Sequence, residues 1–191
     1  MKEAKMAGIM AVLLTVSLAA QAPVDRGQAA NVDAIALRTF EQRLNTYLEL
    51  RKELAGRMTP LTPTGSAAEL TTRQDALAKG LRAARAGAKP GDLVPAPVAR
   101  QMAAAIVADF KLRSAAAERA AFSEVPNAPR PAINQIYPAE AALPTVPPLL
   151  LMNLPPLPDN LQYRFYGRHL LLIDGDVQII VDYIPNVLPP H

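Results

Sequence analysis

Hydrophobic residues recur every three or four positions over three stretches of the chain, which predicts three amphipathic helices. The first is expected to run from a cap at Asn31 or Asp33 to about Met58. Arg, Lys and Glu residues occupy the positions between the apolar ones, as on the solvent face of a helix. The apolar positions are Leu37, Phe40, Leu44, Tyr47, Leu48 and Leu54.

The second and third helices have local start signals. The segment MTPLTPTG contains two prolines and a glycine, which end the first helix. Ser66 and Glu69 have capping-box spacing, so a second helix is expected from there to about Ala86. It would place Leu70, Leu77 and Leu81 on one side. A third amphipathic helix, starting near Pro97 and running to about Phe122, is predicted from the pattern of Val98, Met102, Ile106, Phe110 and Leu112. Short connections indicate an antiparallel helical layer.

Residues 126–158 hold 10 of the 19 prolines, which excludes a long helix or a central strand there. The sequence LPTVPPLLLMNLPPLP is also densely apolar. We therefore expect an extended, proline-rich strap across the helices, with one helical turn at Pro147 to Asn153.

The chain ends in three short runs of strand-forming residues: 163–166, 169–173 and 177–184. Gly167-Arg168 and Asp174-Gly175-Asp176 separate them and are typical of hairpin turns. An antiparallel β-meander follows, and the fold class is α+β. Asp174, Asp176 and Asp182 are interpreted as turn and edge residues. The alternative, an oxygen-ligand cation site at Asp174 and Asp176, lacks the glutamate that closes a calcium loop.

The N-terminal segment has the pattern of a secretory signal peptide. Lys2 and Lys5 precede an apolar run from Met6 to Ala20, and Ala20-Gln21-Ala22 is a cleavage motif. Cleavage is expected after Ala22; an uncleaved anchor is the alternative, although the run of about 15 residues is short for one. The expected organisation is a signal peptide (1–22), a helical region (23–125), the strap (126–158) and the meander (159–191).

The composition narrows the class of protein further. The net charge of +3 is too small to indicate nucleic-acid binding. The absence of cysteine excludes disulfides, thiolate metal sites and a lipidated cysteine anchor. A cysteine-free exported chain fits a bacterial periplasm or exterior, and no cofactor is indicated.

Candidate ligand-binding residues lie around the first hairpin. Arg164 and Arg168 can form an anion clamp, since guanidinium groups match carboxylates and phosphates, and His169 lies beside them. Solvated charges and an ordinary strand histidine are the simpler interpretation. His169 is the only internal histidine, and together with His191 at the end of the sequence and no cysteine it gives too few ligands for zinc. Lys79, Arg82, Arg85 and Lys89 form a basic stripe, which suits either an anionic partner or the C-terminal end of a helix.

No nucleophile elbow, Walker loop, dinucleotide fingerprint or zinc-protease motif occurs in the sequence. A hydrolase with an unrecognised carboxylate pair stays open. The favoured function is a non-catalytic binding or structural module that contacts another envelope protein through apolar residues 142–158. The alternative is a small-ligand or metal-responsive periplasmic protein, with its site near Arg164, Arg168, His169, Asp174 and Asp176.

Two segments, RAARAGAKPGDLVPAPVAR and PPLLLMNLPPLPDNLQYRFYGRHLLLIDGDVQIIVDYIPNVLP, resemble a group of uncharacterised exported bacterial proteins. That resemblance implies a helical N-terminal part and a proline-led, strand-rich ending, and no activity. Residues 161–184 are also similar to the C-terminal ends of small periplasmic proteins of nickel and cobalt homeostasis. The shared features are a Tyr-Arg pair before an apolar strand and an Ile-Val-Asp segment after it. No ligand cluster here matches that metal role.

Overall fold

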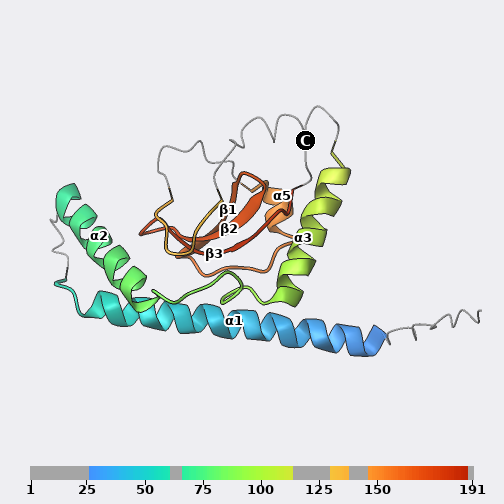
Figure 1. Cartoon of the computed structure of the whole chain (residues 1–191), viewed down its shortest axis with the longest axis horizontal. Helices are drawn as coiled ribbons and strands as arrows, with labels where there is room; N and C mark the ends of the chain where they lie inside the picture. The colour runs from blue at the N-terminus through green and yellow to red at the C-terminus, as the bar shows by residue number, and fades with distance from the viewer. Residues whose placement is uncertain (1–25, 61–65, 114–129, 138–145, 189–191) are drawn as a thin grey trace, which may run out of the picture.

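The computed structural model describes residues 26–60, 66–113, 130–137 and 146–188. Three helices pack with a three-stranded antiparallel sheet, which confirms the expected α+β class (Figure 1). The expected signal peptide and its cleavage site at Ala22 lie outside the described residues. The elements are α1 (Arg26–Gly56), α2 (Ala67–Ala84), α3 (Ala96–Lys111), α5 (Pro148–Leu151), β1 (Leu161–Tyr166), β2 (His169–Asp174) and β3 (Ile179–Ile184).

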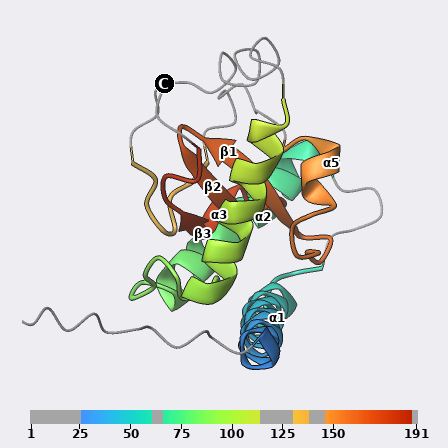
Figure 2. The same ribbon diagram turned by 90° about the vertical axis from the view of Figure 1, so that its right-hand side faces the viewer.

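Helix α1 forms the base of the molecule, and the sheet lies above it between α2 and α3 (Figure 1). Helix α2 descends to α1, the segment that joins α2 to α3 runs along α1, and α3 rises at the other end of the sheet (Figure 1). The view turned by 90° shows α1 end-on below α3 (Figure 2). Ala36, Phe40, Leu44 and Tyr47 form the buried stripe of α1 at the expected spacing. The helix begins at Arg26, before the caps expected at Asn31 or Asp33.

The start signals of α2 and α3 are confirmed, but one residue of each predicted apolar pattern is exposed. Ser66 and Glu69 form the capping box, and Pro97 lies in the first turn of α3. Leu70, in the first turn of α2, is 46% exposed, whereas Leu77 and Leu81 further along the helix are buried. Leu112 is 89% exposed because α3 ends at Lys111, and the helical spacing no longer places the next residue on the buried face.

The sheet has the order β1-β2-β3, and both of its faces are covered. One face packs on the helices through Tyr163, Phe165, Leu170 and Leu172. The other buries Tyr166, Leu171, Ile173, Ile180 and Tyr183 with Tyr137. A β-bulge lies between the pairs Leu172–Asp182 and Ile173–Ile180, so β3 carries an extra residue, Val181. Both Val181 and Asp182 consequently turn toward the helices.

The described parts of the proline-rich strap have two separate roles. Residues 134–137 run along β3, where Asn134 N donates to Ile180 O (2.8 Å) and Ile180 N donates to Gln135 O (2.9 Å). This pairing covers the β3 edge of the sheet. The predicted helical turn is confirmed as α5, which packs on α3. Residues 126–129 and 138–145 of the strap, and residues 114–122 of the expected third helix, lie outside the described residues.

Candidate functional site

Helix α5 presents apolar side chains to solvent from a firmly held backbone. Leu150 is 0% exposed and anchors the turn in the core, together with Val146 and Leu154. The hydrogen bonds Leu151 N to Pro147 O (3.0 Å) and Asn153 N to Leu150 O (2.9 Å) close the turn. Leu149 is 73% exposed and Met152 is 82% exposed. We call Leu149, Leu151 and Met152 the α5 surface.

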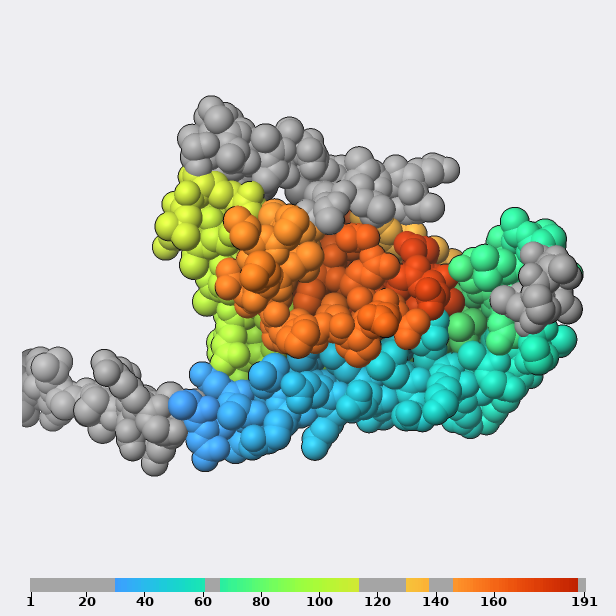
Figure 3. Space-filling view, turned by 180° about the vertical axis from the view of Figure 1, so that it is seen from behind, coloured from blue at the N-terminus to red at the C-terminus, as the bar shows by residue number. Residues whose placement is uncertain are grey.

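A hollow of about 240 Å³ lies beside the α5 surface. Leu37 of α1 and Met102 of α3 line it, and Met152 forms part of its wall. The space-filling view from behind shows the orange residues around α5 at the surface, between α3 in lime and α1 in blue (Figure 3). Three elements therefore meet at a surface that combines projecting apolar side chains with an adjacent depression.

Arg164 and Arg168, the two members of the predicted anion clamp, have different neighbours in the structure. Arg164 lies on the outer face of β1, near Tyr137, and its positive charge partly offsets the effect of burial, which raises the pKa of the Tyr137 phenol. Arg168 instead points toward the end of the chain, where its Nε donates to Leu188 O (2.9 Å). Among the described residues the hydroxyl of Tyr137 has no hydrogen-bond partner, although Tyr137 is only 1% exposed.

His169 and Arg168 do lie together, and Arg130 joins them. Burial lowers the pKa of His169, and the charges of Arg130 and Arg168 lower it further. The ring packs edge-on against Tyr183, with centroids 5.9 Å apart, and Nδ1 accepts a hydrogen bond from Asn186 N (3.3 Å). Arg130 could not be found from the sequence, because it lies in the proline-rich strap, far from the hairpin along the chain.

The predicted basic stripe loses one of its four members. Arg85 turns inward, where Nη2 donates to Val181 O (2.9 Å) and the guanidinium lies 5.2 Å from the centroid of the Tyr47 ring. Burial lowers the pKa of Arg85. Arg85 thus joins the sheet to α1 and α2, while Lys79, Arg82 and Lys89 remain exposed.

The sequence-based interpretation of Asp182 as an edge residue is wrong: the side chain is fully buried. Its carboxylate accepts hydrogen bonds from the backbone N–H groups of Gly91 (2.9 Å), Leu93 (2.8 Å), Val94 (2.8 Å) and Tyr183 (2.8 Å). Gly91 has φ +90°, a conformation that glycine adopts without strain. Asp182 therefore holds the α2–α3 connection on the sheet.

Asp174 holds α1 on the sheet in a similar way. It is fully buried, and it accepts from the Tyr47 hydroxyl (2.7 Å) and from Arg51 Nε (2.9 Å). Arg51 also pairs with Asp176, which accepts from Asn160 Nδ2 (2.9 Å). Burial raises the pKa of Tyr47 well above its ordinary value of 10, and Asp174 adds to the rise. Because Arg51 already pairs with both aspartates, their role is structural.

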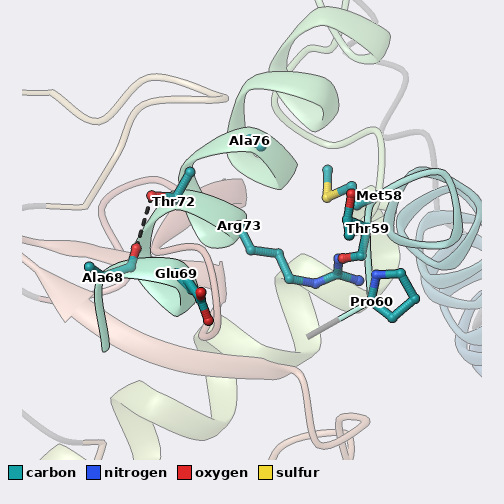
Figure 4. A pocket seen from close by; sticks show the side chains of 8 residues that line it. All are labelled: Met58, Thr59, Pro60, Ala68, Glu69, Thr72, Arg73 and Ala76. Carbon is teal, nitrogen blue, oxygen red and sulfur yellow. Dashed lines mark hydrogen bonds between the residues drawn. The ribbon is translucent and has the colours of Figure 1, made fainter. Parts of the chain in front are cut away.

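A hollow of about 500 Å³ lies at the corner where α1 meets α2 (Figure 4). Met58, Pro60, Ala68 and Ala76 supply apolar walls. Its charged side chains make structural bonds: Glu69 completes the capping box, and Arg73 reaches across to the carbonyl oxygens of Ala55 (3.1 Å) and Thr59. The capping box satisfies the N-terminal end of α2, and the Arg73 bonds close the C-terminal end of α1.

No protein-family model, curated protein or solved structure matches the chain, so the resemblances described above remain expectations. Within residues 26–60, 66–113, 130–137 and 146–188, no three His, Asp or Glu side chains gather closely enough to hold a metal ion. None of the helices in this part of the chain combines the length and apolar character of a membrane span.

Proposed function

We propose that the chain is an exported bacterial envelope protein that acts as a non-catalytic binding module, with the α5 surface as its contact site. The observation that carries this proposal is the contrast within one helical turn. Leu150 is completely buried, whereas Leu149 and Met152, on either side of it, are largely exposed. Apolar side chains held in water by a rigid backbone lose solvent contact favourably when a partner covers them.

The neighbourhood of α5 adds support. Prolines at 147 and 148 start the turn, and proline restricts its conformation before any partner binds. A surface ordered in advance loses less conformational entropy on binding than a flexible one. The hollow between α1 and α3 offers a depression into which a partner's apolar side chain can insert, as in the centres of many protein interfaces.

Export to the periplasm or exterior rests on the sequence alone: Lys2 and Lys5, the apolar run and the motif ending at Ala22. N-terminal sequencing of the protein from bacterial cells that express the full chain tests it. We expect the purified protein to begin at Pro23. A protein that retains Met1 and stays in the cytoplasm would overturn this part of the proposal.

Site-specific photocrosslinking in intact cells tests the contact site. A photoreactive phenylalanine analogue in place of Met152 should crosslink to a discrete envelope protein. The same analogue in place of Leu70, an exposed leucine on α2, is the matched control. Equal crosslinking from both positions, or none from position 152, would refute the α5 surface as the binding site.

Leu150 must stay unchanged in these experiments, because its side chain belongs to the core. Loss of the crosslinked partner in a Leu149→Ser variant that keeps the wild-type unfolding midpoint would locate the contact on the α5 surface.

A further inference from the structure

A cluster of basic side chains at the β1–β2 turn is held in place by the last described residues of the chain. We call Arg130, Arg168 and His169 the basic corner. Arg168 is fixed by its bond to Leu188 O, and His169 is fixed by the bond from Asn186 N and by Tyr183. Arg130, the exposed member, lies close enough to affect the pKa of His169.

The hydrogen bonds leave donors available at this corner. Because Nδ1 of His169 accepts from Asn186 N, the proton of the neutral ring is assigned to Nε2. Arg168 uses Nε for Leu188 O, which leaves its two terminal nitrogens. Within the described residues, neither these nitrogens nor Nε2 of His169 has a hydrogen-bond partner.

The charge at the basic corner is not balanced by the described residues. The ion pairs among them involve Arg51, Arg57 and Arg113, all away from this corner. Burial is the main cause of the lowered pKa of His169, and the positive charges of Arg130 and Arg168 add to it, so both guanidinium groups act on this ring.

We propose that the basic corner binds a phosphate group. Two guanidinium groups provide forked donors that match phosphate oxygens, and the Nε2–H of neutral His169 provides a further donor. Two positive charges, one of them fixed by the bond from Arg168 to Leu188 O, complement a phosphate dianion better than a single carboxylate. The phosphate can belong to a free anion or to a lipid headgroup, which share this chemistry. The proposal is independent of the α5 surface.

The test uses protein purified from cells that express the full chain, with inorganic phosphate as the probe. NMR follows the His169 ring nitrogens while phosphate is added at constant ionic strength. We expect a saturable shift of the Nε2 resonance and an affinity at least about tenfold weaker in Arg130→Gln, because one of two charged donors is lost. Arg82→Gln removes an exposed arginine on α2 and should leave the affinity unchanged.

Two further arms define the ligand. Sodium acetate at equal ionic strength should bind more weakly than phosphate, and an equal response would overturn the assignment to a phosphate group. Vesicles of phosphatidylglycerol, compared with phosphatidylcholine, test the lipid source by co-sedimentation. Co-sedimentation of the protein with phosphatidylglycerol vesicles that is lost in Arg130→Gln would assign the phosphate to a lipid headgroup. The proposal would be refuted if neither phosphate nor vesicles distinguish the wild type from Arg130→Gln.

Discussion

Replacing Asp182 with asparagine should strongly destabilise the protein. The carboxylate accepts four backbone N–H groups while fully buried. Asparagine keeps one acceptor oxygen and turns an NH₂ group toward two of those donors. Two bonds are then lost, and since a hydrogen bond to a charged group contributes about 1.5–3 kcal/mol, we expect a loss of about 3–6 kcal/mol.

Urea unfolding followed by circular dichroism at 222 nm measures this loss as a shift of the midpoint. Asp176→Asn is the matched control, because Asp176 is 53% exposed and pairs with Arg51 at the surface. Such a pair contributes about 0–1 kcal/mol, so the control should unfold close to the wild type. If Asp182→Asn and Asp176→Asn lose the same free energy of unfolding, the four bonds do not hold the α2–α3 connection as argued.

Three further variants test other parts of the fold. Tyr47→Phe should flatten the loss of stability above pH 10. The raised pKa of Tyr47 makes a contribution that is fully present below pH 10 and is lost as the pH rises through the folded-state pKa; equal alkaline slopes in urea titrations would contradict it. Leu150→Ala should cost about 2–5 kcal/mol, because it empties a core site, and Leu149→Ala less than about 0.5 kcal/mol; similar midpoints would show that α5 is not anchored as described. His169→Asn should reduce the loss of stability on acidification. The pKa of His169 is lowered on folding, so stability falls as the pH drops below the unfolded value of 6.5. A fall between pH 7 and pH 5 that is as steep in the variant as in the wild type would refute this cause.

The helices could be predicted because their signals are local. The stripe of Phe40, Leu44 and Tyr47 and the capping box of Ser66 and Glu69 lie within a few turns of the chain. The strand runs and the turn at Gly167 were equally visible, since strand propensity and turn residues are read over a few positions.

The inward-facing charges could not be predicted in the same way. Asp182 follows a bulge at Val181 that reverses the expected alternation, and a bulge of this kind leaves no mark in residue type here. Arg85 has the same spacing as the exposed Lys79, Arg82 and Lys89, and only the distant Val181 and Tyr47 distinguish it. At the candidate sites, the contrast between Leu149 and Leu150 likewise depends on the packing of α5 on α3.

The bonds that hold α1 and the α2–α3 connection on the sheet also set the order in which the chain can fold. Tyr47 and Asp174 are 127 residues apart, and Leu93 and Asp182 are 89 apart. During synthesis the helical half therefore emerges with its apolar stripe uncovered and waits for the last strands, since distant contacts form slowly. The native packing of α1 and of the α2–α3 connection can therefore form only after Asp174 and Asp182 have left the ribosome, so the apolar stripe of α1 stays open to other contacts for most of the time that synthesis takes.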